Sequence, residues 1–308
     1  MELYQRMAED LRVDERYILI SSKRNSLYTK YYIDKKDGGK RLILHPSKEL
    51  KVLQYWVCHN IFNKFPVSKY SMAYSKGCSI KKNAMIHKDS KYILHTDIVK
   101  FFESITRQTL VNFFKRNQTI VDQLGLTEND LHFIFDIVLY RGQNLVVGSV
   151  ASPIISNCIM YEFDNKINEL LLSRMENYRY TRYADDIIVS TKNYIEPDII
   201  NVIRDLLAEY SFNMNMKKTY FMNKKGKRHI TGVVIDNNDN HISMGREKYC
   251  LLKRELYNYL VKGIGKQEVI KGKLSYLYSL DKDKYKSVFE VYKKYDKDQK
   301  IFATTNIS

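Results

Sequence analysis

The segment at residues 180–190 reads Tyr180-Thr181-Arg182-Tyr183-Ala184-Asp185-Asp186-Ile187-Ile188-Val189-Ser190. Two adjacent aspartates separate two runs of β-branched and aromatic residues, and this pattern predicts a β-hairpin with its carboxylates at the turn. Two like charges in an apolar hairpin favour a bound divalent cation, and Mg²⁺ takes one or two carboxylates together with substrate phosphates. A polar turn without a ligand is the alternative, since aspartate is common in turns for backbone reasons alone.

A third carboxylate stands upstream, at the end of another apolar run. Residues 91–98 predict a strand that ends at Asp97, where an ionised carboxylate is costly to bury unless it is paired or bound to a metal. Three carboxylates on one sheet suit two metal ions, of which one activates an attacking hydroxyl and the other neutralises the leaving group. We therefore expect a site for two Mg²⁺ ions, with Mn²⁺ as a substitute, held by Asp97, Asp185, Asp186 and the backbone carbonyl of Ile98.

The composition points to a folded protein with a polyanionic partner. The chain has 308 residues, of which 44% are hydrophobic, so it can build a large core and two or three subdomains. Its 51 Lys and Arg residues against 35 Asp and Glu give a formal net charge of +16, which favours phosphate neutralisation by a nucleic acid. A solvated basic surface without a partner is the alternative.

The cysteines and the termini favour a cytoplasmic location. Cys58, Cys78, Cys158 and Cys250 are far apart and form no Cys-x-x-Cys pair, so neither a zinc site nor a disulfide framework is indicated. The N-terminus lacks the basic-then-apolar pattern of a signal peptide, and no apolar run reaches membrane-spanning length. The sequence thus predicts a soluble cytoplasmic protein without a membrane partner.

The rest of the sequence predicts further hairpins and helices. Residues 31–44 predict a hairpin with a basic tip at 34–39, and its Lys40 and Arg41 suit a triphosphate, although an ordinary solvated hairpin fits equally well. Ser104 and Ser152 are expected to cap the helices that follow them. Residues 229–235 predict one strand of a last hairpin. Beyond residue 244 the chain becomes helical and strongly basic, which marks a domain boundary.

Several of these segments, taken together, resemble the sequence blocks of reverse transcriptases. Tyr183–Asp186 matches the Tyr-x-Asp-Asp box, and Asp97–Phe102 matches the block of the first aspartate. Four further segments resemble bacterial retron reverse transcriptases in particular. The resemblance covers roughly residues 30–250 in continuous order. The other matching segments are Gly148–Pro153 and Lys218–Thr219 for the wider family, and Asn83–His87, Ile230–Gly232, Arg41–Trp56 and Gly245–Tyr249 for retrons.

The resemblance implies an α+β right-hand polymerase fold with fingers, a palm of antiparallel sheet plus helices, and a helical thumb. Residues 1–90 would form the N-terminal helices and fingers. Residues 91–243 would form the catalytic palm with inserted fingers elements, and residues 244–308 the basic thumb. In that family Asp97, Asp185 and Asp186 would hold the catalytic metals, and Lys218 would protonate the pyrophosphate leaving group, unless it is a solvated lysine.

The resemblance also implies which residues meet the nucleotide and the RNA. Phe102 would exclude a 2′-hydroxyl and so select deoxynucleotides, unless it is only a core residue. The expected nucleotide-site residues are Lys40, Arg41, Ile98, Phe101, Phe102 and Gly148. The expected RNA-binding residues are Asn83, His87, Thr231, Gly232, Arg246, Lys248, Lys253 and Arg254; His87 has the alternative of a structural histidine.

The implied function is RNA-directed DNA synthesis of the retron type. Such enzymes prime from a 2′-hydroxyl of their own structured noncoding RNA, polymerise deoxynucleoside triphosphates into a branched RNA–DNA product, and work with an effector protein in antiphage defence. The chain departs from the family at Val146, Val147, Ser149, Val150 and Lys100, and Val147 stands where the nucleotide loop usually has a glutamine. The alternatives are another bacterial reverse transcriptase, of group II intron or abortive-infection type, and an RNA-binding scaffold without catalysis.

Overall fold

A computed structural model describes residues 2–23, 27–34, 38–174 and 177–302. The helices and strands are mixed along the chain, which confirms the expected α+β class. The basic hairpin tip that we expected to approach a triphosphate includes residues 35–37, which lie outside the described residues. No helix in the described ranges is both long and apolar enough to cross a bilayer.

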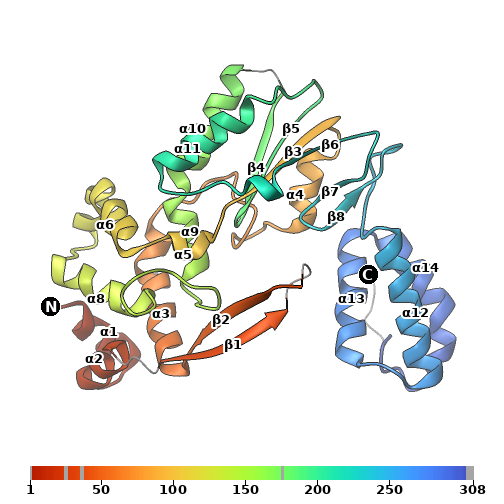
Figure 1. Ribbon diagram of the computed structural model, residues 1–308. Coiled ribbons are helices and arrows are strands. Elements are labelled where there is room, and N and C mark those ends of the chain that lie inside the picture. The colour runs from red at the N-terminus through yellow and green to blue at the C-terminus, as the bar shows by residue number, and fades with distance from the viewer. Residues whose placement is uncertain (1, 24–26, 35–37, 175–176, 303–308) are drawn as a thin grey trace.

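The first part of the chain is helical except for one projecting hairpin. Ser47 caps the third helix by accepting the N–H of Leu50, as its position after Pro46 suggests. Strands β1 and β2 pair antiparallel along their whole length and extend away from the helices (Figure 1). The elements are α1 (Leu3–Leu11), α2 (Glu15–Lys23), β1 (Tyr28–Asp34), β2 (Lys40–Pro46), α3 (Lys48–Asn60), η1 (Phe62–Lys64) and α4 (Ile80–His87).

A four-stranded antiparallel sheet with the order β4-β5-β3-β6 forms the centre of the molecule. Its two central strands are buried on both faces. Leu94 and Val189 join a core with helices α10 and α11, whereas Ile93 and Ile188 face a second core with α4 and the C-terminal helices. The strands are β3 (Tyr92–Asp97), β4 (Arg179–Tyr183), β5 (Asp186–Thr191) and β6 (Tyr220–Asn223).

Helices connect the central strands and carry most of the larger core. The longest of them, α10, contributes the buried residues Phe163, Ile167 and Leu171. The elements are α5 (Phe101–Ser104), α6 (Arg107–Arg116), α7 (Gln118–Gln123), α8 (Glu128–Val138), α9 (Ser152–Ile159), α10 (Tyr161–Arg174), α11 (Ile199–Glu209) and η2 (Met216–Lys218).

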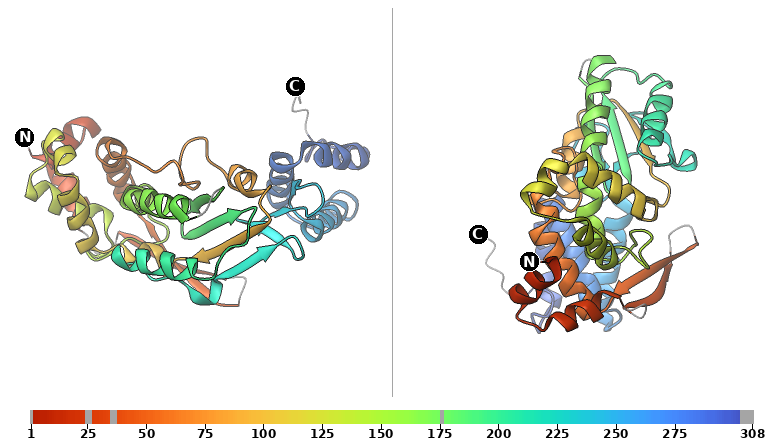
Figure 2. Two further views of the ribbon diagram at one scale, coloured as in Figure 1. Left: turned by 90° about the horizontal axis from the view of Figure 1, so that it is seen from above. Right: turned by 90° about the vertical axis from the view of Figure 1, so that its left-hand side faces the viewer.

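A small three-stranded sheet joins the centre to a C-terminal helical bundle. The N-terminal helices and this bundle lie at opposite ends of the molecule with the central sheet between them (Figures 1 and 2). The small sheet consists of β7 (Arg228–Ile230), β8 (Val233–Ile235) and β9 (Ile242–Ser243), and the bundle of α12 (Arg246–Lys262), α13 (Gln267–Leu280), α14 (Lys282–Tyr292) and η3 (Lys293–Tyr295).

Three local expectations were wrong. Residues 229–235 form two antiparallel strands, because Thr231 and Gly232 have φ of 47° and 81° and turn the chain between them. Ser104 ends α5, and Thr106 caps α6 instead through a capping box. Ser152 lies inside α9, where its hydroxyl donates to the carbonyl of Val146 at 2.8 Å and so is used to hold the preceding loop.

Candidate active site

Sheet pairing brings the three expected aspartates together. Asp97, the last residue of β3, is the register partner of Asp186, the first residue of β5. Asp185 lies in the β4–β5 turn, and its carbonyl accepts the N–H of Ile98 at 3.0 Å. Carboxylate oxygens of the three aspartates lie within 4.8 Å of one another, and no other such cluster of His, Cys, Asp or Glu occurs among the described residues.

A buried arginine, Arg182, holds the turn that carries Asp185. Ala184 has a φ of 56°, which is costly for a residue with a side chain. Arg182 donates to the Ala184 carbonyl at 3.0 Å and to both carboxylate oxygens of Asp164 at 2.8 Å. Because the side chains of Arg182 and Asp164 are 0% exposed, this contact fixes the strained turn from the protein interior.

The three carboxylates repel one another in the absence of a cation. The pKa of Asp185 rises to about 6, first because the carboxyl is buried and then because the charges of Asp186 and Asp97 lie close. A divalent cation would remove this repulsion, and carboxylate oxygens are the ligands that Mg²⁺ and Mn²⁺ prefer. The donor set therefore fits such an ion.

Lys218 forms an ion pair with Asp97. Its Nζ is 2.8 Å from Asp97 Oδ2, and this hydrogen bond, together with nearby carboxylate charge, raises the pKa of the lysine. Asn215 donates to the other oxygen of Asp97 from its side chain at 3.2 Å and to the Asp97 carbonyl from its N–H at 2.7 Å. Both contacts come from the turn before β6, so this turn fixes the orientation of Asp97.

His95 belongs to the same cluster and was missed from the sequence. Its Nε2 lies 3.2 Å from Asp186 Oδ1, and its Nδ1 lies 3.2 Å from the carbonyl oxygen of Lys218. Burial by itself lowers the pKa of His95, but the hydrogen bond and charge of Asp186 outweigh it and raise that pKa. The signal was available, since residues two apart in a strand share one face and His95 precedes Asp97 by two.

The expected nucleotide-site residues lie on three segments. The Phe101 and Phe102 rings are 5.3 Å apart, with Phe101 buried and Phe102 half-buried. Lys40 and Arg41 are exposed on β2. Gly148 has a φ of 108°, and a Cβ on it would lie 2.7 Å from the carbonyl oxygen of Leu44 on that same strand. Glycine therefore lets the loop of residues 146–150 lie directly against the hairpin.

Asn83 and His87 lie in the interior, although we expected them to contact RNA. Both side chains are 0% exposed. His87 makes hydrogen bonds of 2.7 Å to Thr181 and Ser190 of the central sheet, and burial lowers its pKa to about 3. Asn83 accepts from Thr181 and donates to Thr231 at 2.9 Å. Any effect of Asn83 or His87 on RNA must therefore pass through a neighbour such as Thr231.

The other expected RNA-binding residues surround the Thr231–Gly232 turn or lie on the exposed side of α12. The Gly232 carbonyl accepts from Lys248 Nζ at 2.8 Å and from the Tyr276 hydroxyl at 3.1 Å, so two helices of the bundle hold this turn. A pocket of about 730 Å³ opens beside it and is lined by Lys227, Arg246, Lys248 and Lys284 among others. The exposed basic residues of α12 include Arg246, Lys248, Lys253 and Arg254.

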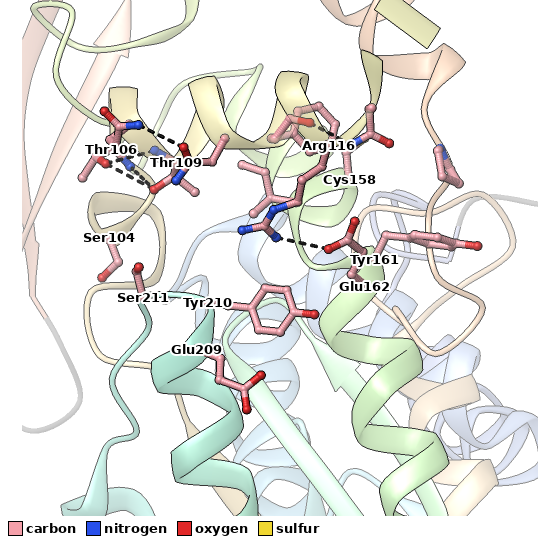
Figure 3. A pocket seen from close by; sticks show the side chains of 16 residues that line it. Ser104, Thr106, Thr109, Arg116, Cys158, Tyr161, Glu162, Glu209, Tyr210 and Ser211 are labelled. Carbon is pink, nitrogen blue, oxygen red and sulfur yellow. Dashed lines mark hydrogen bonds and ion pairs between the residues drawn. The ribbon is translucent and has the colours of Figure 1, made fainter. Parts of the chain in front are cut away.

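A smaller pocket of about 280 Å³ is separate from the aspartate cluster. It is bounded by α6, α9, α10 and the end of α11, and it contains the ion pair between Arg116 and Glu162 at 3.1 Å (Figure 3). Arg116 also lies 5.7 Å from the ring centre of Tyr210. None of the three clustered aspartates lines this pocket.

Comparison with known proteins confirms the resemblance seen in the sequence. The family model of reverse transcriptase (RNA-dependent DNA polymerase) matches residues 33–235. The Retron Ec73 reverse transcriptase of Escherichia coli is 34% identical over 82% of this chain and 83% of its own length. The Retron Ec86 reverse transcriptase of the same species is 29% identical over 88% of this chain and 82% of its own length.

Solved structures agree on the fold. Telomerase from Candida albicans, solved with a fragment of telomeric RNA, superposes with a TM-score of 0.50 at 13% identity over 96% of this chain. The chain spans 59% of that telomerase chain, and the likeness shows the fold alone. The expected right-hand polymerase fold is confirmed. With the family model and the retron relatives, these findings show that the chain belongs to the reverse transcriptases, the RNA-dependent DNA polymerases, and among them to the retron type.

Proposed function

We propose that this reverse transcriptase copies part of a cognate structured noncoding RNA into single-stranded DNA that stays joined to the RNA through a branch. The observation that carries the catalytic part of the proposal is the cluster of Asp97, Asp185 and Asp186, whose oxygens lie within 4.8 Å of one another. The branched product and the cognate RNA are what the resemblance to retron enzymes implies. Deoxynucleoside triphosphates are the substrates. We further propose that the protein works in the cytoplasm with an effector protein in antiphage defence, as the resemblance to retron enzymes implies.

The aspartates and the Ile98 carbonyl would hold two Mg²⁺ ions, with Mn²⁺ as a substitute. When bound, such ions lower the pKa of the attacking hydroxyl and neutralise the triphosphate. Asp97 and Asp186, fixed by strand register, provide a rigid pair of ligands, and the turn places Asp185 beside them. This preorganisation is what phosphoryl transfer requires, since its rate depends mainly on positioning and on charge stabilisation.

Lys218 is the proposed general acid for the pyrophosphate. A lysine ammonium is protonated at neutral pH whether or not its pKa is raised, so a proton is available at Nζ beside the carboxylates. On the nucleotide side, Lys40 and Arg41 would bind the triphosphate, and Phe102 would lie against the sugar. Phe101 packs behind Phe102, and Gly148 keeps the loop close to β2.

The thumb and the small sheet are the proposed RNA-binding surface. Thr231 and Gly232 lie at the junction between palm and thumb, with exposed basic side chains on the adjoining helix. Asn83 and His87 would support the surface from inside through Thr231. The proposed subdomains remain residues 1–90, 91–243 and 244–308, and the exposed basic residues of the surface are Arg246, Lys248, Lys253 and Arg254.

Nucleic acid that copurifies with the protein from its native host tests this function. We expect RNA that is covalently joined to DNA, with a 2′–5′ branch that survives ribonuclease digestion and is opened by a debranching enzyme. The Asp185→Asn variant should copurify with the RNA alone. DNA without a branch would leave a reverse transcriptase of another type, and equal DNA yield from the variant would favour the scaffold without catalysis.

A further inference from the structure

Tyr74 has an unusual backbone conformation beside the candidate active site. Its φ is 60°, in the left-handed region that large side chains rarely adopt. Although it is aromatic, 55% of the residue is exposed. A strained conformation persists only where the surrounding structure imposes it, and such residues gather at functional sites.

Buried polar groups fix the three residues that precede Tyr74. The Met72 N–H donates to the carbonyl of Arg182 at 2.7 Å, which joins the segment to the edge of β4. Asn157 Nδ2 donates to the Ala73 carbonyl at 2.9 Å, and Asn157 Oδ1 accepts from the Ser71 hydroxyl at 2.9 Å. Ser71, Asn157 and Arg182 are each no more than 2% exposed. The residue before Tyr74 is thus fixed from the interior by the network that also holds the Asp185 turn.

The Tyr74 ring is a neighbour of Phe102 in the expected sugar site. Its centre is 6.5 Å from that of Phe102, with an angle of 39° between the rings. The pKa of the Tyr74 hydroxyl is raised, first because neighbouring atoms partly remove the hydroxyl from water and then by the charge of Asp185, while the charge of Arg41 lowers it. Phe102 therefore has two aromatic neighbours, Tyr74 and Phe101, and the ring centre of Phe101 lies 5.3 Å away.

We propose that Tyr74 is a positioning residue that, together with Phe101, holds the Phe102 ring in the orientation that excludes a 2′-hydroxyl. This inference rests on the proposed function. The half-buried Phe102 ring would turn more freely without Tyr74, and a ring that turns away leaves room for ribose. The ring of Tyr74 carries the role, because no hydrogen bond from its hydroxyl occurs within the described part of the chain.

The test compares single-nucleotide incorporation of a deoxynucleotide and the matching ribonucleotide on a primed RNA template, with kcat and KM for each. The preference is the ratio of kcat/KM for the deoxynucleotide to kcat/KM for the ribonucleotide. Tyr74→Ala is expected to reduce this ratio by about tenfold, because a lost apolar contact in a specificity pocket has an effect of that size. The loss should come mainly from better use of the ribonucleotide. Tyr74→Phe, which keeps the ring, should retain the wild-type ratio.

Two controls separate this proposal from general damage and from the proposed function. Tyr55→Ala removes a tyrosine that is 61% exposed on α3 and should change neither the ratio nor the melting temperature. Phe102→Ala should lose more discrimination than Tyr74→Ala. An unchanged ratio in Tyr74→Ala, while Phe102→Ala loses discrimination, would overturn the role of Tyr74 alone. Failure of the wild-type protein to incorporate either nucleotide would instead overturn the proposed function.

Discussion

Replacing Arg182 by methionine is expected to destabilise the protein by about 3–5 kcal/mol. Arg182 and Asp164 form a pair at 2.8 Å in which both side chains are 0% exposed. Methionine leaves the Asp164 carboxylate buried with the Tyr180 hydroxyl, at 2.7 Å, as its only side-chain donor among the residues that the structure describes. The magnitude follows from this uncompensated charge, since loss of one partner of a buried pair costs far more than loss of an exposed one.

A triple variant separates stability from positioning. Asp164→Leu, Tyr180→Phe and Arg182→Met together remove the ion pair and the Tyr180 hydroxyl bound to it, while Asn157 keeps its hydrogen bond from Ser71. This variant should recover most of the lost stability, because apolar residues of similar volume often replace a buried ion pair without cost. The Ala184 carbonyl would still lack its donor. We therefore expect the triple variant to fold but to incorporate nucleotides more slowly than the wild-type protein.

Urea unfolding followed by circular dichroism gives the stability change from the midpoint and slope of the transition. Single-nucleotide incorporation, measured well below the transition, gives the activity of each variant. A loss of less than 1 kcal/mol in Arg182→Met would refute the account of the buried pair. Wild-type incorporation by the triple variant would refute the role of Arg182 in holding the turn.

Three further predictions concern single residues. Gly148→Ala places a Cβ 2.7 Å from the Leu44 carbonyl oxygen at a φ of 108°. The melting temperature of this variant should therefore fall, and its KM for deoxynucleotides should rise. Gly272→Ala is the control, because a Cβ there meets open space, and it should show neither change. The pKa of Asp185, about 6 against an ordinary 3.8, means that the metal-free folded protein holds this proton more tightly than the unfolded chain. Stability in EDTA should therefore fall as pH rises from about 4 to 6, and Asp185→Asn should remove up to about 3 kcal/mol of that change in urea unfolding. Lys218→Ala should lower kcat by about 10²-fold, as expected for a lost general acid, and an unchanged single-turnover rate would exclude that role.

The aspartates were predictable because their signals are local. Asp185 and Asp186 lie between strand-like runs, and Asp97 ends one, so the hairpin and the strand end follow from period-two patterns. Their meeting depends on strand order, which the family resemblance implies and the register of Asp97 with Asp186 shows. Lys218 could be named only through the resemblance, because nothing in its own neighbourhood indicates a carboxylate partner.

Other features depend on tertiary contacts that carry no local signal. A polar motif such as Asn83 with His87 does not say whether its side chains face solvent, and here the sheet supplies buried partners in Thr181 and Ser190. Asn215 lies in an irregular turn whose path is set by the neighbouring strand. The segment that leads into Tyr74 is fixed by Asn157 and Arg182, which are more than 80 residues away in the sequence and therefore leave no local pattern.

The measurement that most directly tests the central claim is the rate of single-nucleotide incorporation, with Mg²⁺ and a primed RNA template, by the wild-type protein and by Asp97→Asn, Asp185→Asn and Asp186→Asn. All four proteins would first be matched for folded content by circular dichroism. Since each carboxylate is proposed to hold metal in one shared site, every single substitution is predicted to lower the rate by at least about 10³-fold. A wild-type rate in any one of the three folded variants would contradict the claim.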